Sequence, residues 1–187
     1  NGVYCRNSVH LDPNYISIGN PDLIEKRRHR EVLVGPGGNL ADYIPFYFTP
    51  YSIMLFNIKT GYGGIKQVPN ADIAILVTSL HRVQELGIRF VLTDRHAYSA
   101  LADYYDSLSS LEKIDWALLN SRNFKHDPDD QLKKERYQAE ALVHNHLPPN
   151  GLIGVVCNNK NIAEQLSVES KALKLDVQVV AKPDWYF

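Results

Sequence analysis

The segment from Gly37 to Phe48 places a pair of glycines directly before a run of aromatic residues that a proline interrupts. A buried strand is normally aliphatic and continuous, so aromatic side chains on both sides of Pro45 are more typical of a pocket wall than of a core strand. The flat faces of Tyr43, Phe46 and Tyr47 could stack on nucleobases or on a nicotinamide ring. The alternative is that they pack a sheet against a helix, and the aromatic residues alone favour this simpler interpretation.

Composition indicates one globular domain without covalent cross-links. The chain has 187 residues, of which 44% are hydrophobic and 22% are charged, and a chain of this length can bury a large core unaided. Its two cysteines, Cys5 and Cys157, argue against a disulfide framework and fit a reducing cytoplasm. Because no apolar run approaches the roughly 20 residues that cross a bilayer, we expect a cytoplasmic protein with no membrane association.

The net charge of -1 excludes a uniformly basic clamp for nucleic acid but leaves room for local basic patches. Two such clusters occur, at residues 25–30 and 133–136. Runs of this kind are usually solvated helix faces, so a phosphate-binding role needs a further reason to single out one of their arginines.

Hydrophobic periodicity predicts short strands and helices in irregular alternation. We expect helices at residues 22–30, 79–86, 97–119 and 160–173, a long loop or loose helix at 120–134, and strands at residues 52–58, 72–77, 88–93, 140–146, 152–157 and 177–181. Asn20 is a suitable N-cap for the first helix, with Pro21 at its first position. Because the strands outnumber the strong helices and are unevenly spaced, the pattern favours an α+β fold over a doubly wound parallel sheet.

Glu140 opens the apolar segment 140–146. A carboxylate at this position is poorly placed for solubility, which indicates a catalytic carboxylate with restricted access to water. The alternative is a residue at a sheet edge that pairs with Lys134 or Arg136.

Residues 93–96, with the sequence Thr-Asp-Arg-His, directly follow a predicted strand. Polar residues at a strand end often lie in a functional site. The competing interpretation is a turn in which Asp94 caps a following helix, and the motif alone favours that interpretation.

His144 and His146 would share one side of a strand, and with Asp94 or His96 they could bind a metal ion. The signal is weak, because two alternating histidines without a placed third ligand are common. No P-loop, dinucleotide-binding glycine motif, nucleophile elbow or zinc-protease helix motif is present. A conventional dinucleotide-binding or kinase fold therefore has no support.

Taken in order, several of these segments resemble the DarT family of DNA ADP-ribosyltransferases, the toxins of bacterial toxin–antitoxin systems. The matching segments cover residues 25–28, 37–50 with Ser52 and Met54, 90–96, 135–143 and 182–187. The likeness extends from about Gly2 to the last residue, and order and spacing are kept.

The resemblance implies an ADP-ribosyltransferase-like α+β core of short strands with flanking helices. It also implies a glycosyl transfer that consumes NAD and attaches ADP-ribose to a base in single-stranded DNA, thymidine in the better-known branch. No metal is expected. The implied partners are single-stranded DNA and an antitoxin with a macrodomain that removes ADP-ribose.

Individual residues match positions with roles in the family. Glu140 matches the catalytic glutamate, and Arg27 matches the catalytic arginine of the NAD-binding segment, with Arg28 as the alternative if the alignment shifts by one. The expected NAD contacts are Arg27, Tyr4, Asn7 and a segment at 12–30 that folds over the cofactor. The expected DNA contacts are Tyr47, Tyr51, Met54, Arg95 and His96. The last of these begins the loop that presents the base.

Two departures from the family pattern have consequences. Tyr51 occupies a position where many members have arginine, and Ile53 a position where the same pattern has proline, which implies an altered DNA contact and base preference. The family's N-terminal segment that helps to hold NAD would precede residue 1. We therefore expect residues 1–187 to form one domain that lacks this segment and binds NAD poorly.

The chemistry of the matched residues agrees with this activity. Cleavage of the nicotinamide–ribose bond passes through an oxocarbenium-like state, which a carboxylate stabilises. An arginine can neutralise the pyrophosphate or, in unusual surroundings, assist removal of a proton from the base. Two alternatives remain. One is a non-catalytic module that binds single strands and has no need of Glu140, and the other is a metal-dependent hydrolase built on His96, His144 and His146.

Overall fold

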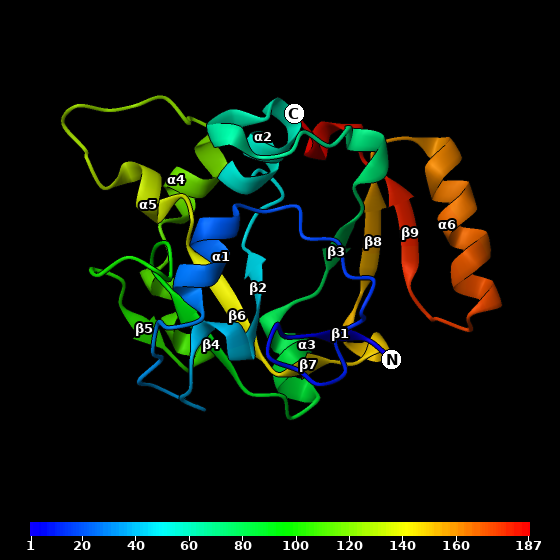
Figure 1. Cartoon of the computed structure of the whole chain (residues 1–187), viewed down its shortest axis with the longest axis horizontal. Helices are drawn as coiled ribbons and strands as arrows, with labels where there is room; N and C mark the ends of the chain where they lie inside the picture. The colour runs from blue at the N-terminus through cyan, green and yellow to red at the C-terminus, as the bar shows by residue number, and fades with distance from the viewer.

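Three sheets and six α-helices make up the structure, a computed structural model that describes residues 1–187. The largest sheet has antiparallel strands in the order β2 (Tyr43–Tyr47), β6 (Glu140–His144), β4 (Phe90–Thr93) and β5 (Tyr104–Tyr105). A second sheet has the order β3 (Ile75–Val77), β8 (Gly154–Cys157) and β9 (Gln178–Ala181), and β1 (Val3–Tyr4) pairs with β7 (His146–Leu147). The helices are α1 (Pro21–Arg27), α2 (Ile53–Thr60), α3 (Leu80–Glu85), α4 (Trp116–Ser121), α5 (Lys133–Arg136) and α6 (Lys160–Ala172). This arrangement, shown in Figure 1, confirms the predicted α+β class.

β6 lies between β2 and β4, and its first four residues are buried. Val143 joins the main core with Phe90 and Leu92 of β4. Because β6 is paired on both sides, its first residue, Glu140, has a fixed place at the end of the sheet. The predicted strand is confirmed as far as His144, after which a left-handed residue separates β6 from β7.

β2 is an edge strand, which is where a sheet tolerates proline. Pro45 lies opposite Leu142 and is exposed. Tyr43 is buried, and its hydroxyl donates to the Gly37 carbonyl at 2.8 Å, so this ring belongs to the core as the simpler interpretation predicted. Tyr47, at the other end of β2, lies opposite the first residue of β6, and this register puts the two side chains on the same face.

The sequence signals for α1 are confirmed. The Asn20 side chain accepts a hydrogen bond from the Leu23 N–H at 3.0 Å, and Pro21 occupies the first turn. The helix crosses in front of β2 and β6 in Figure 1. Because Arg27 is its last residue, the helix carries this side chain to the end of the sheet.

The predicted strand at residues 52–58 is wrong, because this segment forms most of α2. Ser52 caps the helix by accepting a hydrogen bond from the Leu55 N–H at 3.0 Å, and Gly61 ends it with a φ of 72°. Leu55 and Ile58, three residues apart, are its buried side chains. A short apolar run does not distinguish a helix from a strand by itself, but the serine and the glycine at its ends are helix signals.

The predicted helix at residues 97–119 is also wrong over most of its length. The segment contains turns, β5 and a 3-10 helix before α4 begins. Main-chain N–H groups that a helix would use form hydrogen bonds with side chains instead. The Tyr98 N–H donates to His96 Nδ1, and the Leu101 N–H donates to Ser99 Oγ. Local hydrogen bonds of this kind compete directly with helix formation.

The remaining elements, α3, α6, β3, β4, β8 and β9, lie close to their predicted positions. Ser79 caps α3 and Asn159 caps α6, each through its side-chain oxygen. In Figure 1, α6 packs beside β9 at the edge of the second sheet, on the far side of the molecule from β4 and β5. None of the helices combines the length and the apolar character that a membrane span requires.

Candidate active site

The guanidinium of Arg27 and the carboxylate of Glu140 form a two-point ion pair at the end of β6. Nη1 donates to Oε1 at 2.9 Å, and Nη2 donates to Oε2 at 2.8 Å. The two side chains are 14% and 2% exposed, so the pair is shielded from solvent. The alternative in which Glu140 pairs with Lys134 or Arg136 is wrong, and Arg28, the residue that follows α1, is exposed.

Two further hydrogen bonds hold Glu140. The Ala97 N–H donates to Oε1 at 3.0 Å, and the Glu140 N–H donates to Thr93 Oγ1 at 3.2 Å. Burial disfavours the ionised carboxylate, but the charge and hydrogen bonds of Arg27, with smaller effects from His96 and the Ala97 N–H, hold its pKa below the ordinary value. Glu140 is therefore ionised at neutral pH.

Tyr47 is half-buried beside this ion pair. Burial and the charge of Glu140 raise the pKa of its hydroxyl well above the ordinary value, and Arg27 offsets only part of this effect. The phenol therefore keeps its proton. A neutral ring of this kind offers both a hydrogen-bond donor and an aromatic face at the site.

The loop after β4 is fastened to the residues that precede β6. The His96 N–H donates to the Glu135 carbonyl at 2.9 Å, and the Ser99 hydroxyl donates to the Glu135 carboxylate at 2.6 Å. Arg30 Nη2 donates to the Ser99 carbonyl at 3.1 Å. These contacts fix Ala97 and with it the N–H that reaches the buried carboxylate. Sequence reasoning missed Glu135 and Ser99, because no local pattern shows that two segments 36 residues apart meet.

His96 is a neutral imidazole at pH 7. Burial lowers its pKa, while the opposite charges of Glu140 and Arg27 act on it in opposite directions. Nδ1 accepts the Tyr98 N–H at 3.2 Å, so the proton of the neutral ring is on Nε2. The structure thus brings His96 into the electrostatic environment of the ion pair, and its expected contact with DNA stays a prediction.

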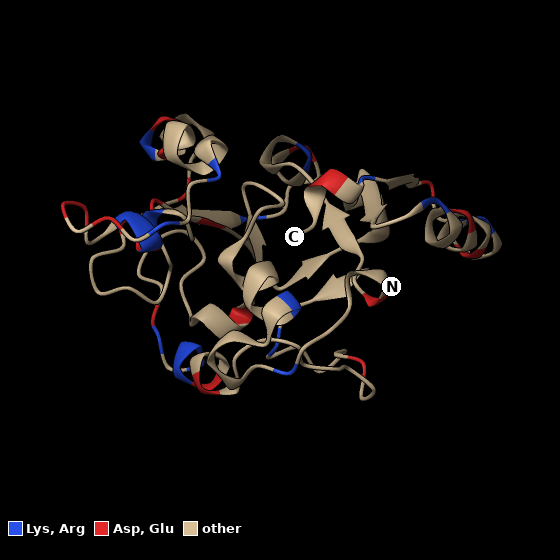
Figure 2. Cartoon of the chain, turned by 90° about the horizontal axis from the view of Figure 1, so that it is seen from above, with Lys and Arg blue, Asp and Glu red and all other residues tan.

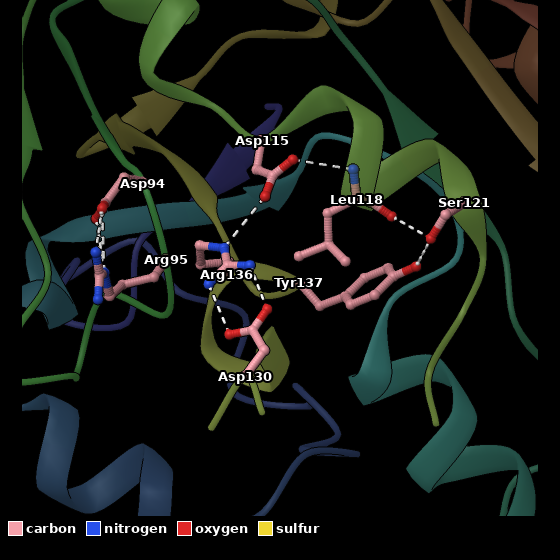
Figure 3. Close-up of polar contacts among 8 residues, drawn as sticks. All are labelled: Asp94, Arg95, Asp115, Leu118, Ser121, Asp130, Arg136 and Tyr137. Carbon is pink, nitrogen blue, oxygen red and sulfur yellow. Dashed lines mark hydrogen bonds and ion pairs between the residues drawn. The ribbon is translucent and has the colours of Figure 1, made fainter. Parts of the chain in front are cut away.

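Arg95, an expected DNA contact, forms an ion pair with Asp94, as Figure 3 shows. Its Nη2 donates to Asp94 Oδ2 at 2.7 Å, and its Nε donates to the same carboxylate. Asp94 also accepts the Asp103 N–H at 3.1 Å, so it closes a loop, and the interpretation that it caps a helix is wrong. A contact between Arg95 and DNA must share or replace this ion pair.

Tyr51 and Met54, two further expected DNA contacts, lie at the start of α2. Met54 is 40% exposed. The guanidinium of Arg122 lies over the Tyr51 ring, 3.5 Å from its centroid. Position 51 therefore has a cation beside it although the residue itself is a tyrosine. Sequence reasoning missed Arg122, because an isolated arginine in a polar loop is not a distinctive signal.

Tyr4 and Asn7, the expected NAD contacts, lie at the opposite end of β2 and β6 from Glu140. Tyr4 stacks on His146 with the ring centroids 4.3 Å apart. Asn7 Nδ2 donates to Asp42 Oδ1 at 2.7 Å. The structure does not bring these two residues together with the ion pair, so a ligand that contacts both groups must extend along the sheet, as a dinucleotide can.

The two histidines near the end of β6 do not share one strand. His144 ends β6 and its ring tilts against Tyr43, whereas His146 belongs to β7. The expectation that both imidazoles lie on one side of a strand is wrong, because Asn145, with a φ of 60°, turns the chain between them. No group of three or more His, Cys, Asp or Glu side chains lies close enough together to hold a metal ion.

Charge on the molecule is distributed locally. In Figure 2, Lys and Arg lie at several separate places along the chain, with Asp and Glu interspersed among them. This distribution agrees with the net charge of -1. Electrostatic attraction for a nucleic acid must therefore come from a few cations near the site and not from the whole surface.

The sequence model of the family described as "ssDNA thymidine ADP-ribosyltransferase, DarT" matches residues 1–187. The chain belongs to the DarT family. A DNA ADP-ribosyl transferase of Escherichia coli O127:H6 (strain E2348/69 / EPEC) is 49% identical over 187 residues, which are 100% of this chain and 86% of that protein. A DNA ADP-ribosyl transferase of Thermus sp. (strain 2.9) is 32% identical over 183 residues, 94% of this chain and 83% of that protein.

Solved structures of DarT proteins share the fold. Thermus sp. 2.9 DarT in complex with ADP-ribosylated ssDNA matches with a TM-score of 0.88 and 29% identity, over 99% of this chain and 87% of that one. The same protein in complex with NAD+ matches with a TM-score of 0.84 and 26% identity, again over 99% and 87% of the two chains. The predicted family and fold are confirmed, and the chain is an ADP-ribosyltransferase that uses NAD and acts on single-stranded DNA.

Proposed function

We propose that Glu140 and Arg27 are the catalytic residues of this ADP-ribosyltransferase, and that they transfer ADP-ribose from NAD to thymidine in single-stranded DNA. The observation that carries the proposal is the buried, two-point ion pair between their side chains at the end of β6. A buried charged pair in an otherwise apolar sheet gives little net stability, which is a reason to look for a functional role.

Glu140 acts on the ribose of NAD. Cleavage of the bond between nicotinamide and C1 of the ribose leaves positive charge on the sugar, and an ionised carboxylate stabilises that charge. The lowered pKa keeps Glu140 ionised for this role. A nucleophilic atom of the base then forms the new bond to C1 and loses its proton, so that the reaction is a glycosyl transfer with nicotinamide as the leaving group.

Arg27 serves as a fixed positive charge. Burial opposes its ionisation, but Glu140 outweighs this effect and raises the pKa of Arg27. Of the two roles open to an arginine here, neutralisation of the pyrophosphate fits the raised pKa better than removal of a proton from the base. Binding of NAD must loosen the ion pair, because the same carboxylate has to face the ribose.

The base is held by the aromatic and imidazole groups around the pair. Tyr47 shares a face of the sheet with Glu140, and His96, with its proton on Nε2, lies on the adjoining loop within the electrostatic reach of the pair. A single strand presents its bases unpaired, so a base can stack on a tyrosine without the cost of opening a duplex. Arg95, Tyr51 and Met54 are proposed as contacts to the rest of the strand.

Two further elements of the proposal rest on the family. We propose that the activity is toxic to a bacterial cell, in whose cytoplasm single-stranded DNA is exposed during replication. We also propose that an antitoxin with a macrodomain removes the ADP-ribose again. Co-expression with such a hydrolase, compared with its inactive form, should restore growth if this pairing is correct.

The test of the catalytic proposal uses labelled NAD and single-stranded oligonucleotides that differ in base composition. The wild-type protein should label only strands that contain thymidine. Glu140→Ala should lose about 100-fold or more in rate, since removal of one transition-state charge contact costs about 3–4 kcal/mol. Glu164→Ala on α6 is the matched control and should keep full activity. Full activity of a folded Glu140→Ala variant would overturn the assignment.

A further inference from the structure

The main chain of Ala97 is held at both of its polar groups. Ala97 is fully buried, and its N–H donates to Glu140 Oε1 at 3.0 Å. Its carbonyl accepts a hydrogen bond from the hydroxyl of Tyr104 on β5. Because the two groups belong to one residue, a contact that fixes the carbonyl also restricts where the N–H can point. The Tyr104 hydroxyl therefore acts on the carboxylate of Glu140 through Ala97.

The same carbonyl is linked to the ring of His96. The peptide unit between Ala97 and Tyr98 accepts the Tyr104 hydroxyl at its oxygen, and it donates its N–H to His96 Nδ1 at 3.2 Å. Hydrogen bonds at the two ends of one peptide unit polarise it in the same direction and strengthen each other. An Nδ1 that accepts leaves the proton of the neutral ring on Nε2. The hydroxyl thus supports one tautomer of His96 across a single peptide bond.

β5 is the element that brings Tyr104 to this place. It lies at the edge of the large sheet beside β4, as Figure 1 shows, and Tyr104 is paired with Thr93. Thr93 Oγ1 accepts the Glu140 N–H at 3.2 Å. The Tyr104 ring packs against the smaller core cluster, to which Ala97 and Leu142 belong. Two paired positions of the sheet therefore hold the main chain and the carboxylate of the same glutamate.

The Tyr104 hydroxyl is a neutral donor at pH 7. Burial raises its pKa, while the hydrogen bond and charge of Arg30 lower it, Glu140 raises it and Arg27 lowers it, and the net result is a pKa above the ordinary value. A carbonyl oxygen can only accept, so the direction of the hydrogen bond to Ala97 is fixed. Because its proton is bound there, the hydroxyl is placed to orient the loop and not to transfer a proton to the substrate.

We propose that Tyr104 is a positioning residue of the transferase, whose hydroxyl fixes Ala97 and thereby sets both the orientation of the Glu140 carboxylate and the tautomer of His96. The proposal rests on the proposed function, because it takes Glu140 as the catalytic carboxylate. Groups that are already oriented before the reaction need no reorganisation in the transition state. Loss of the hydroxyl should therefore slow the chemical step and leave substrate binding intact.

The first experiment compares Tyr104→Phe with Tyr105→Phe, which is the matched control. Tyr105 packs against the main core, so the two changes remove one hydroxyl each from opposite faces of the same short strand. Tyr104→Phe keeps the ring and should lower kcat about tenfold, which corresponds to one hydrogen bond, with unchanged KM values for NAD and DNA. Tyr105→Phe should keep the wild-type kcat. Urea unfolding shows whether both variants are folded.

The second experiment records the nitrogen NMR spectrum of the histidine rings without NAD or DNA, because the two ring nitrogens differ in shift according to which one carries the proton. The His96 signals are identified by their absence from His96→Gln. The wild-type protein and Tyr105→Phe should show the proton of His96 on Nε2, and Tyr104→Phe should show a mixture of the two tautomers. A merely structural role of the hydroxyl would leave the tautomer unchanged.

Both effects are required of Tyr104→Phe. A folded variant that keeps the wild-type kcat, or one that keeps the wild-type ring spectrum, would overturn the proposal. Failure of the proposed function is distinguishable, because Glu140→Ala would then remain active. The ring spectrum still reports the contact in that case, since it is recorded without substrates.

Discussion

Arg27 and Glu140 are 113 positions apart in the sequence, and the two terminal nitrogens of the guanidinium each donate a hydrogen bond to a different oxygen of the carboxylate. The contact joins the last residue of α1 to the first residue of β6. The ion pair holds α1, a helix without buried residues, against the end of the sheet. The ion pair therefore determines where α1 lies, as well as which charges face the substrate.

Arg27→Ala is predicted to be both inactive and less stable. Removal of one partner leaves the buried carboxylate of Glu140 uncompensated, and such a loss costs about 3–5 kcal/mol. Arg27→Lys keeps the charge but cannot form two parallel hydrogen bonds, so it should recover only part of the stability and activity. Arg28→Ala, at the exposed residue that follows α1, is the control and should change stability by less than about 1 kcal/mol. Transfer assays and urea unfolding of the three variants test this, and equal small effects in all of them would contradict it.

Stability should depend on pH through Glu140. Its pKa in the folded protein lies below the ordinary value of 4.5, so the stability it contributes is complete above about pH 4.5. That contribution is lost as the pH falls through the folded-state pKa. In Glu140→Gln this group no longer titrates. The variant should therefore be less stable at pH 7, and the difference from the wild-type protein should shrink in acid.

The measurement is the free energy of unfolding in urea at several pH values from about 3 to 7. Other ion pairs, such as that of Asp130 with Arg136, titrate equally in both proteins and cancel in the difference. Parallel curves over the whole range would mean that Glu140 keeps an ordinary pKa in the folded state.

Much of the fold could be predicted because its signals are local. The Asn20 cap with Pro21 in the first turn marks α1, and the run of apolar residues after Glu140 marks β6. The resemblance to DarT assigned Glu140 and Arg27 their roles, and the structure brings these two side chains together. The pattern of predicted strands and helices indicated the α+β class, and the resemblance to DarT implied the same class.

The errors have both local and tertiary causes. Residues 97–119 have helical spacing, but side chains bind main-chain N–H groups that a helix would use. The Asp94 carboxylate accepts the Asp103 N–H, and Ser99 Oγ accepts the Leu101 N–H. The Ser99 hydroxyl also donates to the Glu135 carboxylate, which ties the loop to a distant segment. The Arg122 guanidinium meets Tyr51 across 71 residues, and no periodicity reports such a contact. The wrong strand at residues 52–58 has another cause. The capping residues of α2, Ser52 and Gly61, are visible in the sequence, and they are stronger evidence for a helix than the short apolar run is for a strand.

Glu135 is predicted to be a positioning residue for the carboxylate of Glu140. Its side chain accepts the Ser99 hydroxyl at 2.6 Å, and its carbonyl accepts the His96 N–H. Ser99→Ala and Glu135→Ala should therefore loosen the loop that supplies the Ala97 N–H, and lower kcat about tenfold with little change in the KM for NAD. Glu135→Gln retains an acceptor and should restore most of the rate. A fall in stability without the split between kcat and KM would indicate a purely structural role.

Tyr51→Arg is predicted to strengthen binding of single-stranded DNA. A tyrosine has neither the charge nor the paired donors of an arginine, so the change should steepen the dependence of log affinity on log salt by about 0.7 if the new side chain meets a phosphate. The guanidinium of Arg122, 3.5 Å from the Tyr51 ring centroid, already supplies one cation at this place. Arg122→Gln alone should therefore reduce the slope by a similar amount.

The two changes should not be additive. With Arg122 present, a second guanidinium at position 51 meets like charge at short range, which limits the gain in affinity. In the Arg122→Gln background that repulsion is absent, so Tyr51→Arg should produce a larger gain there than in the wild-type protein. A salt titration of oligonucleotide binding for the four proteins of this cycle measures the coupling directly. Identical affinities and slopes in all four would show that neither side chain contacts DNA, and that the tyrosine at position 51 has no bearing on the choice of strand.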